Sequence, residues 1–281
     1  MKVLVAEKCG FCPGVRNAIS IAEEILKQRK DVYSLGPIIH NRDVVDRLAR
    51  AGLKTVDSVD EIPRGTVLIR SHGAAPAQLA LIRQKGLDIV DATCVLVKRV
   101  QEIARRLGRD GYKVVVIVYR NHPEVKAVVG CASDVVVVGS LADLRLLPEN
   151  GRLGLVCQTT QTPEYFARMV AAVASRDFQE LRVINTLCRE AIRRQESAVG
   201  LCRKVDVMFV LGGLESANTR KLAELCRNYN PRTFHLQNWA GFDKLMVADA
   251  RTAGVTAGAS TPSWVIEQFV GQLSMLDAGA G

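Results

Sequence analysis

The feature that most constrains the fold is an internal repeat that occurs three times along the chain. In each repeat an apolar segment typical of a β-strand leads to a cysteine, and a helical stretch follows; these residues are Cys12, Cys94 and Cys188. A second apolar segment ends in a short polar motif 28 residues after each cysteine, at His40, His122 and Ser216. Val- and Ile-rich strands that alternate with helices indicate parallel sheets. We therefore predict an α/β fold of three similar units in a pseudo-threefold, trilobed arrangement.

A third apolar segment in each repeat also ends in polar residues. They lie at positions 71–73, 158–160 and 259–261, and each group is followed by a proline and another helical stretch. The last repeat ends without a cysteine-bearing strand, so we expect the N-terminal strand within residues 1–12 to complete it. The predicted units are residues 13–94, 95–188 and 189–281, the last completed by residues 1–12.

Polar and thiol side chains fall at the junctions of this repeat. In parallel α/β sheets, binding groups collect where strand carboxyl ends meet helix N-termini. Three units that face a common axis would bring the three cysteines together. Around them we expect a set of polar residues at equivalent junctions: His40, His72, His122, Thr159, Ser216 and Ser260. Helix N-termini suit both thiolates and anions, which makes this region the candidate site. His235 belongs to no motif and is expected to be structural.

Three thiolates suit more than one metal group. Zinc would usually recruit a fourth protein ligand or a water, whereas a [4Fe–4S] cluster held by three cysteines leaves one iron open to a substrate. The wide separation of the cysteines argues against a zinc finger and favours the cluster, with zinc or buried thiols as alternatives. Cys9 forms a C-x-x-C pair with Cys12, a weak signal. The remaining cysteines are expected in the core: Cys131, Cys157, Cys202 and Cys226.

Composition narrows the class of protein. The chain has 281 residues, 48% of them hydrophobic, and no apolar run of membrane-spanning length or signal-peptide pattern, so we expect a cytoplasmic protein with no membrane partner. The formal net charge is +9, but only 5% of residues are aromatic and no basic tail is present, which does not favour nucleic acid. Such a charge suits an anionic substrate or an acidic electron donor. A monomer or homodimer is expected.

The polar motifs, taken in order, resemble those of the IspH/LytB family. The resemblance extends from residue 1 to about residue 270 and rests on residues 10–15, 40–41, 70–73, 91–94, 122–125, 158–160, 185–188, 216–219 and 258–262. It implies the 4-hydroxy-3-methylbut-2-enyl diphosphate reductase activity of the non-mevalonate isoprenoid pathway. That activity is an iron–sulfur oxidoreductase reaction, which removes the substrate hydroxyl with two electrons and two protons and yields isopentenyl and dimethylallyl diphosphates.

The resemblance also implies roles for individual residues. One [4Fe–4S] cluster would be held by Cys12, Cys94 and Cys188, with the fourth iron open to substrate. The diphosphate would be held by a set of polar residues: His40, His72, Ser216, Asn218 and Ser260. His122, Glu124 and Thr159 would lie near the substrate hydroxyl, with Glu124 as the proton source. An acidic protein such as a ferredoxin or flavodoxin would supply the electrons.

The chain departs from the family pattern at a few positions. Val95 replaces a proline, Ala191 replaces a threonine, and Leu214 and Glu215 replace a Lys-Asn pair. The last change puts a carboxylate close to the expected diphosphate. One alternative is therefore a divergent paralogue that reduces or dehydrates a different anionic substrate. Another is a non-catalytic iron–sulfur sensor. The presence of Glu124 argues against it, because a sensor has no use for a proton donor.

Overall fold

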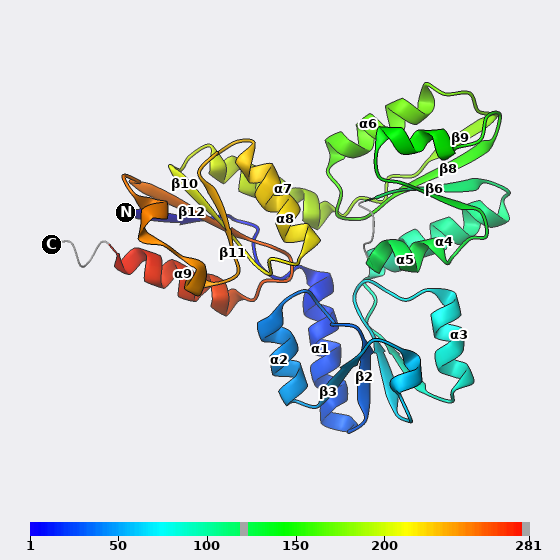
Figure 1. Ribbon diagram of the computed structural model, residues 1–281, viewed down its shortest axis with the longest axis horizontal. Helices are drawn as coiled ribbons and strands as arrows, with labels where there is room; N and C mark the ends of the chain where they lie inside the picture. Colours follow the sequence, from blue (N-terminus) through cyan, green and yellow to red (C-terminus); the bar gives the residue numbers. More distant parts are fainter. Residues whose placement is uncertain (119–122, 277–281) are drawn as a thin grey trace. The chain divides into compact units, whose positions relative to one another are not determined.

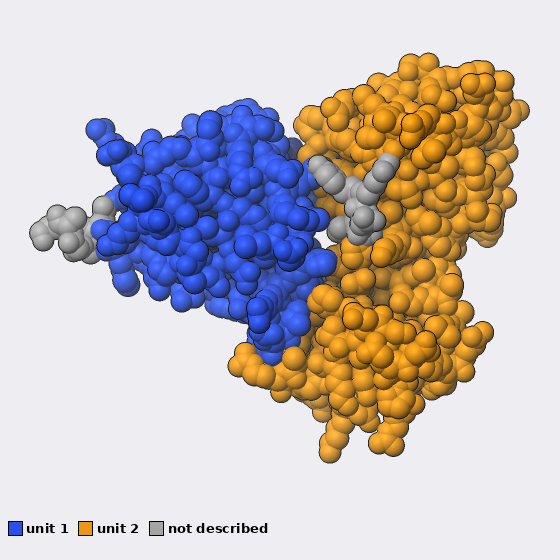
Figure 2. Space-filling model, in the orientation of Figure 1, with its two compact units in different colours: residues 1–16, 39–47, 190–281 blue, residues 17–38, 48–189 orange. Residues whose placement is uncertain are grey.

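The computed structural model describes residues 1–118 and 123–276 (Figure 1). The chain divides into two compact units (Figure 2). Unit 1 comprises residues 1–16, 39–47 and the described part of 190–281, and unit 2 comprises residues 17–38 and 48–189. Unit 2 contains two parallel sheets and unit 1 contains one.

The first sheet of unit 2 has the strand order β3-β2-β4-β5, and all its strands are parallel. Its strands are β2 (Val32–Leu35), β3 (Leu53–Val56), β4 (Thr66–Ile69) and β5 (Asp88–Asp91). The segments that precede or connect these strands in the sequence are α1 (Pro13–Gln28), α2 (Arg42–Arg50), η1 (Val59–Glu61) and α3 (Pro76–Gln84). Ile82 of α3 and Val59 of η1 pack on Tyr33, Val67 and Ile69, so these two segments cover one face.

The second sheet of unit 2 has the order β7-β6-β8-β9. Its strands are β6 (Lys113–Ile117), β7 (Val135–Val138), β8 (Arg152–Cys157) and β9 (Glu180–Val183). Its helices are α4 (Val95–Arg109), α5 (Pro123–Val129), η2 (Leu141–Leu146) and α6 (Pro163–Ala174). Val114 and Val116 pack with α4 and α5, while Val115 and Ile117 pack with α6 and η2. This alternation follows from the two-residue period of a strand and explains why β6 is apolar from Val114 to Ile117.

The sheet of unit 1 has the order β1-β12-β10-β11. Its strands are β1 (Lys2–Val5), β10 (Val207–Leu211), β11 (Thr233–Leu236) and β12 (Thr252–Ala257). Its helices are α7 (Arg189–Cys202), α8 (Ala217–Arg227), η3 (Trp239–Gly241), η4 (Lys244–Val247) and α9 (Ser263–Met275). Helices α7 and α8 cover one face and α9 the other (Figure 1). The N-terminal strand β1 pairs in parallel with β12, with Val3 opposite Ala253.

Three parallel four-stranded sheets with helices confirm the predicted α/β fold of three similar units. The edge strands β3, β7 and β11 were not predicted from the sequence, because they carry none of the cysteine and polar motifs that mark the repeat. The unit boundaries at residues 13–94, 95–188 and 189–281 stay a prediction.

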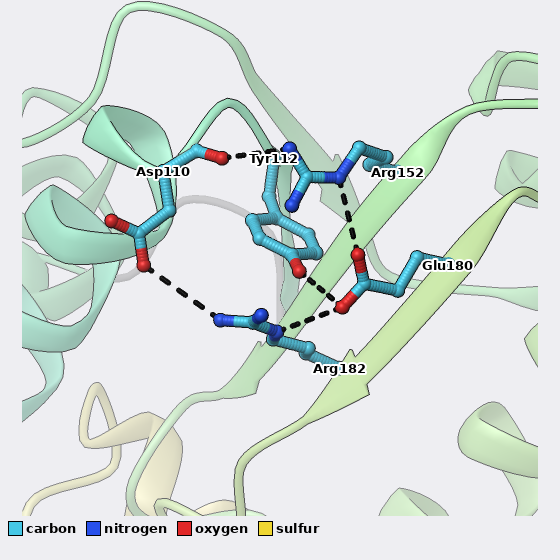
Figure 3. A network of polar contacts seen from close by, with 5 residues as sticks. All are labelled: Asp110, Tyr112, Arg152, Glu180 and Arg182. Carbon is cyan, nitrogen blue, oxygen red and sulfur yellow. Dashed lines mark hydrogen bonds and ion pairs between the residues drawn. The ribbon is translucent and has the colours of Figure 1, made fainter.

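A polar network ties together the amino ends of β6, β8 and β9 (Figure 3). The Tyr112 ring lies between the guanidinium groups of Arg152 and Arg182, at 4.2 and 4.5 Å from the ring centroid. The Glu180 carboxylate accepts hydrogen bonds from the Tyr112 hydroxyl, from Arg152 Nε at 3.2 Å and from Arg182 Nε at 3.0 Å. The backbone carbonyl of Asp110 accepts a further bond from Arg152 at 2.9 Å. The network lies at the end of the sheet away from the polar motifs and has a structural role.

Candidate active site

The three repeat cysteines occupy equivalent positions in the fold. Each immediately precedes a helix, and each is partly exposed. Their backbone N–H groups donate to carbonyl groups in the loop after the third strand of the repeat: Cys12 to Ala259 (3.2 Å), Cys94 to Ser71 (3.0 Å) and Cys188 to Thr159 (2.8 Å). The same hydrogen bond in three places holds each cysteine loop against a predicted polar motif.

Local sequence explains how these loops form. The Asp91 carboxylate accepts the Thr93 N–H at 2.9 Å, and the Asn185 amide oxygen accepts the Leu187 N–H at 3.0 Å. Both are side-chain turns that end the strand and lead the chain to the cysteine one residue later. Neither residue was assigned a role from the sequence. An Asp or Asn three residues before the cysteine occurs in two of the repeats and could have predicted these turns.

The helix N-termini provide a suitable environment for thiolate sulfur. The Val15 N–H, in the first turn of α1, points to Cys12 Sγ at 3.4 Å. Cys94 is the N-cap residue of α4. Free N–H groups and the helix dipole both stabilise a thiolate at such a position.

The three repeat cysteines are the candidate metal ligands of the site. Within residues 1–118 and 123–276, no group of three or more His, Cys, Asp or Glu side chains is arranged to hold one metal ion. Cysteine thiolates are the usual ligands of iron–sulfur clusters, so three partly exposed thiols at helix N-termini fit the chemistry of a cluster.

In unit 1 the backbone of His40 lies beside two polar loops. The Ser260 hydroxyl donates to the His40 carbonyl at 3.3 Å. A Cβ placed on Gly213 would lie 2.9 Å from the same carbonyl, so only glycine permits this approach. The Ser216 N–H donates to the Gly213 carbonyl at 3.0 Å. The structure thus brings His40, Ser216 and Ser260 into one region of unit 1.

Ser216 and Asn218 lie at the start of α8. Ser216 is its N-cap, and its hydroxyl accepts the Thr219 N–H at 3.3 Å. A hydroxyl that accepts at an N-cap keeps its own hydrogen for an anion. A Cβ on Gly258 would lie 2.1 Å from the Thr219 hydroxyl oxygen, so this glycine lets the helix start pack against the loop after β12. The arrangement offers hydroxyl and N–H donors to a negatively charged group.

In unit 2, Glu124 and Thr159 form a buried pair. Glu124 is 3% exposed and Thr159 is 5% exposed. The Thr159 N–H donates to Glu124 Oε1 at 2.8 Å, and its hydroxyl donates to Oε2 at 2.9 Å. Burial raises the pKa of Glu124, and the two hydrogen bonds oppose that rise without cancelling it. Since the Thr159 carbonyl accepts the Cys188 N–H, this acid adjoins one of the three cysteines.

Two further site histidines were predicted in the same unit. His72 follows β4 and is partly buried, beside the Ser71 carbonyl that binds Cys94. His122 lies outside the described residues. Arg70, which was noted only as part of a motif, is also partly buried and packs on Gly36, and burial lowers its pKa.

The substituted positions are mostly open to solvent. Val95 is 75% exposed at the first position of α4, where proline is favoured but not required. Leu214 is 50% exposed, and Glu215 is also exposed. Ala191 is partly buried in the first turn of α7. Solvent around Glu215 weakens its repulsion of an anion.

The residues expected to be structural lie as predicted. Cys157, Cys202 and Cys226 are buried, and the partly buried Cys131 donates to the Ala127 carbonyl at 3.2 Å. His235 lies in β11, and its Nε2 is 3.1 Å from the Gly212 carbonyl. The partly buried Cys9 packs against the two core clusters of unit 1, and burial raises the pKa of its thiol although nearby Arg194 opposes the rise.

None of the helices in the described part of the chain combines the length and the apolar character needed to cross a membrane.

Solved structures resemble this chain over nearly its whole length. The E-1-hydroxy-2-methyl-but-2-enyl-4-diphosphate reductase of Plasmodium falciparum matches with a TM-score of 0.92 and 27% identity, over 97% of this chain and 88% of that one. A second structure, of (E)-4-hydroxy-3-methyl-but-2-enyl diphosphate reductase, is described as the terminal enzyme of the non-mevalonate pathway. It matches with a TM-score of 0.71 and 40% identity, over 98% and 99% of the two chains. These matches agree with the predicted fold class.

Sequence comparison gives the same result. The 4-hydroxy-3-methylbut-2-enyl diphosphate reductase of Pelobacter propionicus is 44% identical, over 99% of both chains. The enzyme of the same name in Geobacter sulfurreducens is 41% identical, over 99% of this chain and 98% of that one. The sequence model of the LytB protein family matches residues 3–274, which include all three repeat cysteines and the Glu124–Thr159 pair. The chain therefore belongs to the LytB protein family.

Proposed function

We propose that this protein is a 4-hydroxy-3-methylbut-2-enyl diphosphate reductase, an iron–sulfur oxidoreductase. In the reaction the carbon–oxygen bond of the substrate hydroxyl breaks, two electrons and two protons are consumed, and water leaves. The products are isopentenyl and dimethylallyl diphosphates. The observation that carries the proposal is the buried Glu124–Thr159 pair, whose threonine carbonyl binds the backbone of Cys188. Full-length relatives with this name support it.

Cys12, Cys94 and Cys188 would hold one [4Fe–4S] cluster, with one iron lacking a protein ligand. When bound, such a cluster supplies electrons and a Lewis-acidic iron beside the substrate hydroxyl. The equivalent positions of the three cysteines before helices support this assignment.

The diphosphate would be bound by a set of polar side chains: His40, His72, Ser216, Asn218 and Ser260. Their chemistry supports this role, because hydroxyl, amide and imidazole groups donate hydrogen bonds to phosphate oxygens. The N-terminus of α8, with 11 residues, adds N–H groups and a favourable dipole.

Glu124 would deliver a proton to the departing hydroxyl, with His122 and Thr159 beside that group. A raised pKa keeps a carboxyl protonated closer to neutral pH, as a general acid requires. Thr159 orients both carboxylate oxygens and so fixes the direction in which the proton is held.

The remaining features of the proposal concern the setting of the enzyme. We expect a cytoplasmic monomer or homodimer that binds no nucleic acid and receives electrons from an acidic protein such as a ferredoxin or flavodoxin. The divergent-paralogue alternative is weakened by the exposure of Leu214 and Glu215. A non-catalytic sensor would have no use for a buried acid such as Glu124, which weakens that alternative.

The test is turnover of the diphosphate by anaerobically purified, cluster-replete protein, with a chemically reduced viologen as electron donor. We expect isopentenyl and dimethylallyl diphosphates among the products by mass spectrometry, and no such products from the matched Glu124→Gln variant. Failure of cluster-replete parent protein to consume the diphosphate would reject the proposed function.

A further inference from the structure

A solvent-exposed aromatic pair adjoins the cysteine loop of unit 1. The rings of Phe11 and Trp264 meet edge to face, with centroids 6.4 Å apart and planes at 90°. The guanidinium carbon of Arg47, an exposed residue of α2, lies 5.1 Å from the Trp264 ring centroid. Trp264 is 39% exposed, so more than a third of the surface of this large apolar side chain is open to solvent.

This aromatic pair adjoins Cys12. Phe11 is the residue before Cys12, whose N–H donates to the Ala259 carbonyl at 3.2 Å. A Cβ on Gly10 would lie 3.1 Å from Ile266 Cδ1 and 3.3 Å from the Thr261 carbonyl oxygen. The loop that carries Cys12 is therefore packed closely against the start of α9, which carries Trp264.

Charges of both signs surround the pair, with a small excess of positive charge: α2 carries three arginines against Asp43 and Asp46. The first turns of α1 and α9 contain no acidic residue, and α1 carries the exposed Arg16 in its first turn. Arg47 lies over the indole ring, while the exposed Glu267 lies one turn further along α9. Tryptophan and arginine are the residue types most enriched at protein–protein hot spots. The surface thus suits a protein partner with acidic groups around an apolar centre.

We propose that the surface formed by Trp264, Arg47 and Phe11 is the docking site of an acidic one-electron carrier protein. This inference rests on the proposed function, which requires two electrons per turnover. Each reduced carrier docks in turn, loses one electron and leaves oxidised. Phe11 lies between the docked carrier and Cys12, so the electron has a short packed path to the proposed cluster. The two electrons join two protons in breaking the carbon–oxygen bond and releasing water.

The experiment compares a protein donor with a small donor. Turnover is driven either by a reduced acidic plant-type ferredoxin or by reduced methyl viologen, which needs no docking surface. We make Arg47→Glu and Trp264→Leu, and use Lys244→Glu as the control, because Lys244 is an exposed lysine of η4 and the charge change is the same. Ferredoxin binding is also measured by titration calorimetry, and iron content is measured for each variant.

We expect Arg47→Glu to lower kcat/KM for ferredoxin about tenfold or more, since charge steering changes association by such factors. Trp264→Leu should lower it by a similar factor, because a tryptophan at the centre of an interface contributes much of the binding energy. Viologen-driven turnover and iron content should stay within about twofold of the parent, and ferredoxin binding should weaken in parallel. The Arg47→Glu effect should shrink at high salt. Ferredoxin kinetics and binding equal to those of Lys244→Glu would overturn the docking site. Absence of viologen turnover in the parent would instead reject the reductase function, while ferredoxin binding still reports on the surface.

Discussion

The Glu124 carboxylate receives two hydrogen bonds from a single residue, Thr159, through the backbone N–H at 2.8 Å and the hydroxyl at 2.9 Å. Two opposing effects meet in this pair. Burial disfavours the ionised carboxylate, while both hydrogen bonds favour it. Burial is the stronger effect, so the pKa of Glu124 is raised. The pair therefore fixes the orientation of the Glu124 carboxyl group beside the Cys188 loop.

Replacing Glu124 with glutamine should abolish proton delivery. The side chain keeps its shape, and its amide oxygen can still accept a hydrogen bond from Thr159. We expect turnover to fall by at least about a hundredfold, as loss of a general acid usually causes. Iron content and the dissociation constant of the substrate should change little. Steady-state kinetics, iron assay and calorimetry measure the three quantities; turnover within a few-fold of the parent would mean that another group supplies the proton.

The same substitution should change how stability depends on pH. A carboxyl with a raised pKa binds its proton more tightly in the folded protein, so its stabilising contribution is complete below the unfolded pKa. The contribution is lost as pH rises through the raised folded pKa, by up to about 1.4 kcal/mol per pH unit in that window. Urea unfolding of the cluster-free protein at several pH values should show this loss for the parent and its absence in Glu124→Gln. Equal slopes for both proteins would contradict the raised pKa.

Thr159 should control the pKa of Glu124. Thr159→Val removes the hydroxyl hydrogen bond that favours the ionised form, so the pKa should rise further and the high-pH limb of activity should move to higher pH. Thr159→Ser keeps the hydroxyl and is the matched control. The pH dependence of kcat, measured with a viologen donor, checks the direction. A limb that moves to lower pH, or moves equally for Ser and Val, would contradict this role.

The three cysteines should be required equally for the cluster. Anaerobically purified parent protein should contain about four iron atoms per chain. Cys12→Ser, Cys94→Ser and Cys188→Ser should each lose the cluster, by iron assay and visible absorbance. Cys131→Ser is the control, because a serine hydroxyl can still donate to the Ala127 carbonyl. Full iron content in Cys94→Ser would overturn the three-ligand assignment.

Much of the fold was predictable because the same pattern of strand, cysteine and helix occurs three times in the sequence. Cys12, Cys94 and Cys188 marked equivalent strand–helix junctions, and each does make the same backbone hydrogen bond. The edge strands β3, β7 and β11 were not predictable in this way, because they carry none of the cysteine and polar motifs of the repeat. Their pairing is a tertiary property, set by the neighbouring strands rather than by their own four residues.

The site was predictable in its residue types but not in its energetics. The motifs named Glu124 and Thr159, which are 35 residues apart, but no spacing reveals that one residue satisfies both carboxylate oxygens. Burial decides the protonation of Glu124, and burial depends on the packed structure. The exposure of Glu215 could not be predicted either, because a side chain in a turn next to the buried Ser216 can point into the solvent or into the protein.

Glu180 should stabilise the sheet that carries Glu124 and Thr159. Hydrogen bonds, of which that from Tyr112 is the strongest, hold the pKa of Glu180 below its ordinary value, with Arg182 and Arg152 contributing. Glu180→Gln should therefore lower the unfolding midpoint at neutral pH, and the difference from the parent should shrink as pH falls through the lowered pKa.

The control for Glu180 is Glu190→Gln, which breaks only a surface ion pair with Arg193 at 3.3 Å. Such pairs contribute little, so its unfolding midpoint should match that of the parent. Thermal unfolding followed by circular dichroism measures both variants. Equal midpoints for Glu180→Gln and Glu190→Gln would show that the network in Figure 3 does not stabilise the fold.

The altered positions test whether the family substrate is retained. The triple variant Ala191→Thr, Leu214→Lys, Glu215→Asn restores the family pattern at these positions. It removes one negative charge and adds one positive charge beside the proposed diphosphate site. Because Glu215 is exposed, its electrostatic cost should be that of a surface charge, about 0.2–1 kcal/mol, which corresponds to about 1.4- to 5-fold in KM. We expect the triple variant to lower KM for 4-hydroxy-3-methylbut-2-enyl diphosphate by such a factor at low ionic strength. The gain should fade in high salt, which screens exposed charges. If the parent instead shows negligible turnover of this diphosphate and gains it only in the triple variant, these positions have moved the enzyme to another anionic substrate, and the paralogue is the correct description.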